Sequence, residues 1–478
     1  MSTSTRSVST AGDLEAAAGD ADVRRIVVDG ELTGVQPVRL APGQQLVGAQ
    51  DAPVVAFAAG VDGLQLSRDN EVSGIRLEVG PEQRAVLNDT AVDDLGTMRL
   101  TGITAVGQVQ ILARDRVRAG HVVVEGLDVV AADVRNRPDR PYLLGVGVVQ
   151  GAFTLWNLQP DDGVVLTAEL RRISAGRDGA PVRGSGVFVG GADAGGRLDV
   201  TVLETGPVFT DGGIAEGTRD LISGGVFVIS GCHVDEVRNR GRITTHGVND
   251  MALDNWGSVN NWIAEAPITT HGRSGVGFVN FGSTTSLRVT APIETHGIGA
   301  RGFNVYTGGS MAVAEFDRIT TRADAAIGVQ VGEHLGRLVV RGDIHTYGAA
   351  GDSLVKGVIT RLSAHALSVL AGGSIGEVSV AGALTSTGHG VTTVDVKGEI
   401  ATMTVHGGIH AQGAGSDAVH VDGGSLGLYD TDVTSGGGAA VRLTRPTRFE
   451  HQRATLRGVE GELIRDSAPA ADGAAEDG

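Results

Sequence analysis

Two kinds of ring-bearing residue recur at a fixed interval in the middle of the chain. Histidine is the fourth residue of three similar five-residue phrases, ITTHG, ITTHG and IETHG, which recur every 25 residues. These histidines are His246, His271 and His296. An aromatic residue recurs with the same spacing, at Trp256, Phe281 and Tyr306. Aromatic rings offer an apolar platform to the C–H groups of sugars, and flanking polar groups bind hydroxyls or a carboxylate. The pattern predicts a strip that binds an oligosaccharide or polysaccharide.

Charged residues beside these files are candidates for catalysis. A lyase needs a base to take the proton next to a uronate carboxylate and a cation for the enolate-like intermediate, roles that suit His271 and Arg301. A glycoside hydrolase needs two carboxyl groups, for which Asp250 and Asp254 form the nearest pair and Glu294 is a third candidate. Six side chains are predicted to bind the substrate: His246, Trp256, Phe281, His296, Asn304 and Tyr306.

The same repeats also have a structural explanation. Like residues stack in β-solenoids because the stacking stabilises neighbouring turns, and Asn255 with Asn280 is expected to form such a ladder inside the fold. Zinc binding is disfavoured, because a straight file of histidines does not converge on a tetrahedral site. We expect no metal and no other cofactor. Two classes of function stay open: a carbohydrate-active protein that uses the face of turns 243–348, and a non-catalytic structural or adhesive solenoid, which includes a homo-oligomer.

The repeated phrases also predict the elements that must position these residues. ITTHG and its variants begin at residues 243, 268, 293, 319, 344, 384 and 409, and an apolar run such as SLRV at 286–289 precedes them. Each repeat of about 25 residues holds three short alternating segments, with glycine-rich corners between them. Such a unit cannot bury its apolar face alone, so the chain must coil until each strand pairs with its equivalent one turn later. The sequence predicts an all-β, single-domain right-handed parallel β-helix with three sheets.

Alternation along each strand predicts which side chains face solvent. In ITTHG the isoleucine faces inward, so the histidine faces outward. In the following strand Leu253 and Asn255 face inward, so Asp254 and Trp256 are expected to be exposed. Two insertions, at 206–224 and 349–370, interrupt the repeat on either side of this block. We expect them to wall the two ends of a groove, because long insertions in a compact fold are often functional.

The β-helix is expected to span residues 11–466. The segment DLEAAAGD at 13–20 predicts a short helix that caps the first coil, because a bare terminal strand is a pairing edge. Disorder is predicted for residues 1–10 and for the small, acidic tail at 467–478.

Composition excludes several classes of function. A net charge of −17 argues against a nucleic-acid binder, which needs a basic surface. No apolar stretch is long enough to span a membrane, and no apolar segment of a signal peptide follows the first residues. The expected location is therefore the cytoplasm, with export by a signal-free route as the alternative. The single cysteine rules out a disulfide within the chain.

The opening IVVDGELTGVQPVRLAPGQQLVGA at 26–49, the x-G-I/L repeats at 73–75, 101–103 and 125–127 and the glycine-cornered turns resemble the right-handed parallel β-helix superfamily that includes pectin and pectate lyases. The ITTHG and GFVNFG turns are also similar to β-helical passenger domains of surface proteins. The resemblance implies the fold and a polysaccharide ligand. It assigns no catalytic residue, because the Trp-x-Asp-His motif of the lyases and the NTD…DD set of the polygalacturonases are missing. The GHG at 388–390 matches one polygalacturonase element but lacks the paired aspartates upstream.

Overall fold

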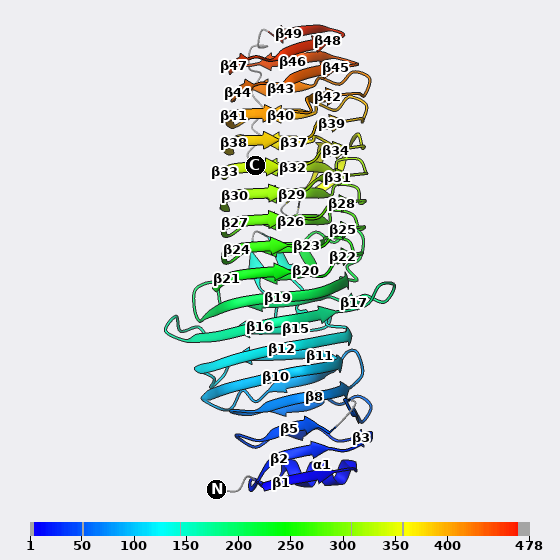
Figure 1. Ribbon diagram of the computed structural model, residues 1–478, viewed down its shortest axis with the longest axis vertical. Helices are drawn as coiled ribbons and strands as arrows, with labels where there is room; N and C mark the ends of the chain where they lie inside the picture. The colour runs from blue at the N-terminus through cyan, green and yellow to red at the C-terminus, as the bar shows by residue number, and fades with distance from the viewer. Residues whose placement is uncertain (1–3, 50–51, 144, 307, 356–357, 467–478) are drawn as a thin grey trace. The chain divides into compact units, whose positions relative to one another are not determined.

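The computed structural model describes residues 4–49, 52–143, 145–306, 308–355 and 358–466. The chain divides into two compact units. Unit 1 comprises Met1–Ala291 and Leu354–Val358, and unit 2 comprises Pro292–Ser353 and Ile359–Gly478. In each unit short strands pair in parallel with their equivalents one coil later, so each is a right-handed parallel β-helix with three sheets (Figure 1). This confirms the predicted fold class.

In unit 1 several long strands belong to both sheet 1 and sheet 2. Sheet 1 contains β1 (Ser4–Val8), β2 (Val23–Val28), β5 (Gln45–Gly48), β21 (Cys232–Asn239), β24 (Ser258–Ala264) and β27 (Ser283–Val289). Sheet 2 contains β3 (Leu32–Val35), β6 (Val54–Phe57), β17 (Val182–Arg183), β22 (Ile243–Thr245) and β25 (Ile268–Thr270). Five strands run from sheet 1 into sheet 2: β8 (Glu71–Glu78), β10 (Asp94–Val106), β12 (Ala119–Ala131), β16 (Val165–Ala175) and β19 (Arg197–Asp211).

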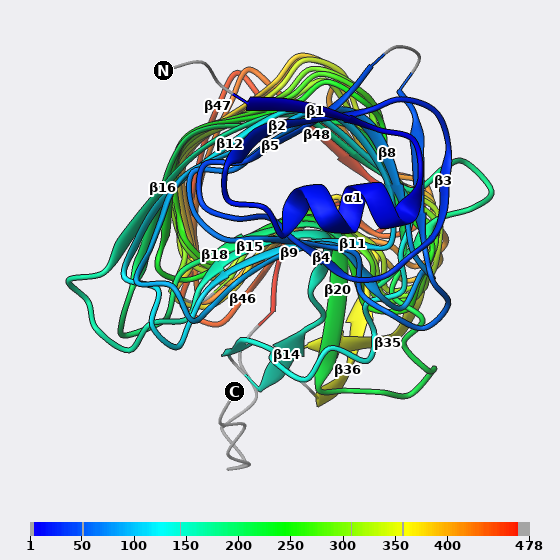
Figure 2. The ribbon, with the colours of Figure 1, turned by 90° about the horizontal axis from the view of Figure 1, so that it is seen from below.

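Sheet 3 of unit 1 closes the coil. It contains β4 (Val38–Arg39), β7 (Leu64–Leu66), β9 (Arg84–Asn88), β11 (Gln108–Ala113), β15 (Gly151–Asn157), β18 (Ser185–Gly190), β20 (Leu221–Val228), β23 (Asp250–Asn255) and β26 (Val276–Asn280). A short antiparallel pair, β13 (Tyr142–Leu143) and β14 (Val146–Val148), leaves the coil between β12 and β15. Figure 2 shows β14 outside the ring of coils, beside the strands of sheet 3.

Unit 2 repeats the same arrangement with shorter strands. Sheet 1 contains β30 (Ser310–Phe316), β33 (His334–Val340), β38 (Ser374–Val380), β41 (Glu399–Val405), β44 (Ser425–Tyr429) and β47 (Arg448–Gln452). Sheet 2 contains β28 (Ile293–Thr295), β31 (Ile319–Thr321), β34 (Ile344–Thr346), β39 (Leu384–Ser386), β42 (Ile409–Ala411), β45 (Asp432–Ser435) and β48 (Thr455–Gly458). Sheet 3 contains β29 (Arg301–Val305), β32 (Ile327–Val331), β37 (Leu367–Val369), β40 (Val394–Val396), β43 (Val419–Asp422), β46 (Ala439–Thr444) and β49 (Gly461–Arg465). Strands β35 (Ala350–Val355) and β36 (Val358–Ser363) form a separate two-stranded sheet.

A left-handed residue bends the long strands where sheet 1 becomes sheet 2. The central glycine of the x-G-I/L repeat has a positive φ in three successive coils, at Gly74, Gly102 and Gly126. The next coil carries Arg172 in register with Gly126, at φ 55°. Glycine adopts this conformation without steric cost, whereas an arginine in the same conformation is sterically strained. The sequence repeat therefore marks a bend required by the backbone.

The core lies inside the coils and is built from stacked side chains. In unit 1, Ile243 pairs in register with Ile268, and Leu253 with Phe278. The predicted inward ladder of asparagines is confirmed, because Asn255 donates through Nδ2 to Asn280 Oδ1 at 3.0 Å. Burying such amides is tolerated where each hydrogen-bonding group finds a partner.

The N-terminal end of unit 1 is capped as predicted. Helix α1 (Ala11–Ala18) begins after Thr10, whose hydroxyl accepts the backbone N–H of Asp13, and it buries Leu14 and two alanines. Figure 2 shows α1 lying across the end of the first coil. The first ten residues were predicted to be disordered, whereas β1 pairs in parallel with β2. The predicted tail, residues 467–478, lies outside the described residues.

Candidate functional site

The predicted histidine file faces outward. His246 and His271 follow β22 and β25 and are exposed, and their rings stack with centroids 4.9 Å apart and planes 10° apart. Both belong to unit 1, whereas His296 is an exposed residue of unit 2. The expected exposure of all three histidines is therefore confirmed.

The prediction that Asp254 and Trp256 are exposed is wrong. Trp256 is 6% exposed and joins an apolar cluster on the outer face of sheet 3. Its ring lies 5.8 Å from that of Phe281, centroid to centroid, and Phe281 is partly buried against the same cluster. The side chains of Asp254 and Trp256 do point away from the core of the coil, as predicted. Val146 and Val148 of β14 and Ile222 of β20 belong to the same cluster, however, and cover these side chains. The two aromatic side chains thus form part of a second apolar layer.

Asp254 is fully buried in the same layer. Neither carboxyl oxygen makes a hydrogen bond of normal geometry with the described residues. Burial raises the pKa of Asp254 well above its ordinary value, and the nearby indole N–H of Trp256 opposes this rise only in part. A buried carboxyl group that holds its proton suits a structural layer better than a surface site.

Asp250 is also fully buried, but every oxygen of its carboxyl group has a donor. Oδ1 accepts the hydroxyl of Ser223 at 3.0 Å, and Oδ2 accepts the hydroxyl of Thr210 at 3.0 Å and the backbone N–H of Gly247 at 3.2 Å. Burial raises the pKa of Asp250 to about 6, against the lowering effect of these hydrogen bonds. The residue ties sheet 2 to sheet 3 at a corner of unit 1.

Glu294 belongs to an exposed polar cluster of unit 2. Arg322 donates through Nε to Glu294 Oε1 at 2.8 Å, and His296 Nε2 lies 3.6 Å from the same oxygen. The guanidinium of Arg322 also lies over the Tyr347 ring, 4.8 Å from its centroid, and His345 stacks on that ring at 4.1 Å. The cluster combines a carboxylate, a guanidinium, two imidazoles and stacked rings, but its members mainly contact one another.

Arg301, Asn304 and Tyr306 lie on or just after β29 in unit 2. Arg301 and Asn304 are each 1% exposed, and Tyr306 is partly buried. Arg301 Nε and Asn304 Nδ2 both donate to Gln330 Oε1, at 2.9 and 3.3 Å. The predicted lyase pair is split between the units, since His271 belongs to unit 1 and Arg301 to unit 2.

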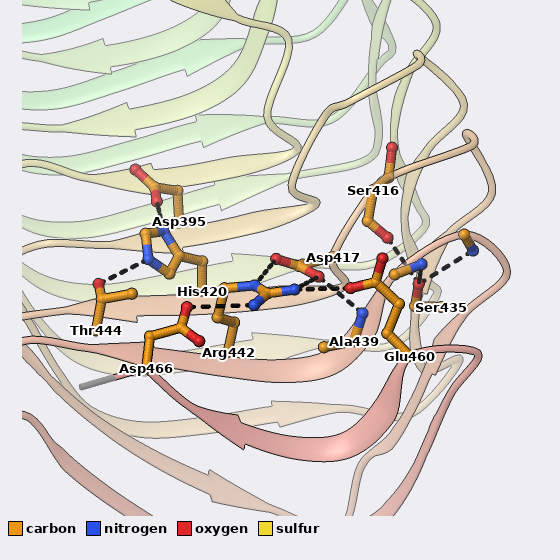
Figure 3. Close-up of polar contacts among 12 residues, drawn as sticks. Asp395, Ser416, Asp417, His420, Ser435, Ala439, Arg442, Thr444, Glu460 and Asp466 are labelled. Atoms are coloured by element: carbon orange, nitrogen blue, oxygen red, sulfur yellow. Dashed lines mark hydrogen bonds and ion pairs between the residues drawn. The ribbon is translucent and has the colours of Figure 1, made fainter. Parts of the chain in front are cut away.

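A polar column that the sequence repeats did not predict lies on the outer face of sheet 3 in unit 2. Asp395, His420 and Arg442 occupy equivalent positions on β40, β43 and β46. His420 Nδ1 lies 2.9 Å from Asp395 Oδ1, and His420 Nε2 lies 2.9 Å from the hydroxyl of Thr444 (Figure 3). Burial alone raises the pKa of Asp395, but the hydrogen bond with His420 and the charges of His365, Lys397 and His420 outweigh it, so the pKa lies below its usual value.

An imidazole held between a carboxylate and a hydroxyl is able to transfer a proton. The hydroxyl of Thr444, however, also donates to Asp422 Oδ1 at 2.7 Å. His420 Nε2 therefore meets a hydroxyl that is already hydrogen-bonded to Asp422, while Nδ1 faces the carboxylate of Asp395. The arrangement orients the imidazole of His420 for proton transfer.

Arg442 forms the other half of this cluster. It donates to Asp417 Oδ2 at 2.6 Å, to Glu460 Oε2 at 2.9 Å and to Asp466 Oδ2 at 3.2 Å (Figure 3). The signal in the sequence was the recurrence of a polar residue between apolar ones in VDVKG, VHVDG and VRLTR. The residues at that position differ from coil to coil, so a search for repeated residues overlooks them.

A shallow groove of about 650 Å³ lies at the corner where sheet 3 leads into sheet 1 in unit 2. Its wall includes four side chains at the same position of successive coils: Ser374, Glu399, Ser425 and Arg448. Five glycines form much of the remaining wall of the groove: Gly372, Gly373, Gly398, Gly423 and Gly424. Lys397 also lines the groove, is exposed and makes no ion pair with the described residues. Asp422 immediately precedes the glycines of one coil, so the polar cluster borders the groove.

No protein-family model matches the chain, and comparisons with curated proteins and with solved structures give no match. Within the described residues, no three histidine, cysteine or acidic side chains are grouped so as to hold a metal ion. No helix in this part of the chain has the length and apolar character needed to cross a membrane.

Proposed function

We propose that this protein binds a polysaccharide in the groove at the corner of sheets 3 and 1 in unit 2. The observation that carries the proposal is the run of the groove over four successive coils. Coils stack about 4.8 Å apart, so four of them give a groove about 14 Å long. That length suits a linear chain of a few sugar residues.

The lining of the groove supports a sugar ligand. The glycines leave backbone groups accessible, and Ser374, Ser425 and Glu399 offer hydroxyl and carboxylate groups to sugar hydroxyls. Lys397 supplies a cation that makes no ion pair with a carboxylate of the described residues. An acidic sugar therefore suits the groove better than a neutral one. The resemblance of the sequence repeats to the superfamily of pectin and pectate lyases supports the same class of ligand, as an analogy at the level of the fold.

The polar cluster beside the groove supplies the chemistry that a bound sugar would meet. His420, oriented by Asp395, is placed to transfer a proton. The exposed strip of Glu294 and His296 is a separate surface, and a role for it in sugar binding stays a prediction. Catalysis is tested by analysing products after incubation with the polysaccharides that bind.

A panel of neutral and acidic polysaccharides tests the proposal by isothermal titration calorimetry. We expect an acidic polysaccharide to bind, and Lys397→Ala to weaken it about tenfold, the effect of one charged hydrogen bond. Ser425→Tyr fills the groove and should abolish binding. Arg341→Ala is the matched control, because Arg341 is an exposed cation that follows the carboxyl end of β33, whereas the groove lies at the amino ends of the sheet 1 strands. This variant should bind as the wild type does. Equal binding by all variants, or no binding to any polysaccharide, would refute the proposal.

A second candidate function rests on the last coil of unit 2. Strands β47, β48 and β49 each pair, among the described residues, with one strand only. Leu463, which is in register with the core residue Val441, is 37% exposed, and Val459 is 75% exposed. An open edge with apolar residues can pair with another chain. A structural solenoid that associates through this end predicts a concentration-dependent mass in light scattering, which Leu463→Lys should abolish.

A further inference from the structure

Arg301 is a buried cation whose guanidinium is only partly satisfied. The side chain is 1% exposed. Nε donates to Gln330 Oε1 at 2.9 Å, and Nη1 donates to the carbonyl oxygen of Gly299 at 3.2 Å and to the hydroxyl of Ser353 at 3.3 Å. Nη2 has no hydrogen-bond partner among the described residues. Two N–H groups of a charged side chain are therefore buried without acceptors.

The charge of Arg301 is also uncompensated. All three of its partners are neutral oxygens, and it forms no ion pair within the described residues. Arg442, which is more exposed, contacts three carboxylates in the same unit. A guanidinium stays protonated at any physiological pH, and burial of a charge without a counter-charge is strongly unfavourable. The position therefore calls for an anion.

An insertion in the repeat helps to build this position. Ile344 pairs in register with Leu384 although they are 40 residues apart, so the residues between them include a segment added to the usual coil. That segment contains Ser353, whose hydroxyl donates to the carbonyl oxygen of Gly299 at 2.9 Å while accepting from Arg301. Together with Gln330 these contacts fix the guanidinium plane. A fixed guanidinium with two free N–H groups on one nitrogen can donate charge-assisted hydrogen bonds to a carboxylate oxygen.

We propose that Arg301 binds a carboxylate group of a ligand through Nη2, on the outer face of sheet 3 in unit 2. The carboxylate has two sources of the same chemistry: a small free acid, or a uronate residue of a polysaccharide. Ser353, Gln330 and Gly299 position the guanidinium and do not themselves need to touch the ligand. The site is separate from the groove lined by Lys397, so the two proposals stand or fall independently.

The full chain is titrated with sodium acetate, with galacturonate and with a galacturonate oligomer, and binding is followed by calorimetry and by thermal shift. Trifluoroacetate serves as a fluorine NMR probe of the same site. We expect the wild type to bind at least one carboxylate and to melt at a higher temperature in its presence. Binding of acetate indicates a small acid, whereas binding of the sugar acids alone indicates a uronate.

Two variants test whether Arg301 is the residue that binds the carboxylate. Arg301→Gln should lose the response, and Arg301→Lys, which keeps the charge but not the second nitrogen, should bind at least tenfold more weakly while remaining folded. Arg322→Gln, an exposed arginine of the same unit, should respond as the wild type does. The proposal is wrong if no carboxylate binds the wild type, or if Arg301→Lys binds as tightly as the wild type. Lys397→Ala should leave carboxylate binding at Arg301 unchanged. This result distinguishes a failure of the Arg301 proposal from a failure of the groove proposal.

Discussion

Replacing Asp250 by asparagine tests the electrostatics of the corner between sheets 2 and 3 in unit 1. The carboxyl group is fully buried, and burial raises its pKa from 3.8 to about 6. The folded protein therefore holds this proton more tightly than the unfolded chain does. Folding stability must fall as the pH rises from about 4 to about 6, because the unfolded state loses the proton first.

The magnitude follows from the size of the pKa shift. A rise of the pKa by about 2 units, at about 1.4 kcal/mol for each, lowers the free energy of unfolding of the wild type by about 3 kcal/mol between pH 3 and pH 8. The substituted asparagine would keep the three hydrogen bonds if its amide nitrogen faced Ser223 and its oxygen faced Thr210 and Gly247. Asp250→Asn should thus stabilise the protein by about 1 kcal/mol at pH 4.5 and by about 3 kcal/mol at pH 8.

Urea unfolding followed by tryptophan fluorescence at pH 4.5 and pH 8 measures this difference. Groups other than Asp250 titrate alike in both proteins, so the difference between them isolates the one carboxyl group. Asp29→Asn, at an exposed position of the same unit, is the matched control and should give the same small change at both pH values. A difference between Asp250→Asn and the wild type that does not vary with pH would refute the raised pKa.

Three further predictions follow from local geometry. Arg172→Gly should stabilise the protein by about 0.5–1 kcal/mol in urea unfolding, since it relieves a positive φ that costs about 1 kcal/mol and loses only a surface ion pair with Glu125; a loss of stability would contradict the assigned strain. The thiol of Cys232, which is buried and has a raised pKa, should not react with Ellman's reagent until the protein unfolds, so rapid labelling of the native protein would disprove its burial. Asn255→Ala should cost about 2 kcal/mol or more of stability, because it removes the hydrogen bonds of this buried amide with Asn280, the carbonyl of Ser283 and the backbone N–H of Gly257; Asn260→Ala, at an exposed position, is the control for this measurement.

The coil itself could be predicted because its register follows from the period of the sequence. Parallel pairing places ITT over ITT, and any other period would turn apolar side chains toward solvent. The asparagine ladder and the left-handed corners of the x-G-I/L repeats follow from the same period. Here one repeated phrase was enough to predict the strands and their pairing.

The candidate site was harder to predict, for two physical reasons. Alternation tells which way Trp256 points but not what lies over it, and the residues of β14 that cover it are more than 100 positions earlier in the chain. The column at Asp395 and His420 consists of complementary residues of different types, so a search for the same residue at each repeat does not find it. The groove is lined largely by glycines, which carry no side chain to suggest a ligand.

The direct pairing of β34 with β39 shows how this molecule can change in length. The residues inserted between them leave the sheet and return to it without altering the register on either side. A duplication of one whole repeat, such as residues 399–424, should likewise be absorbed as one more turn, because each turn contacts only its neighbours. Loss of a single residue within a strand reverses its inner and outer faces. Evolution of such a chain is therefore expected to proceed by whole turns added or lost, and by segments inserted at their corners.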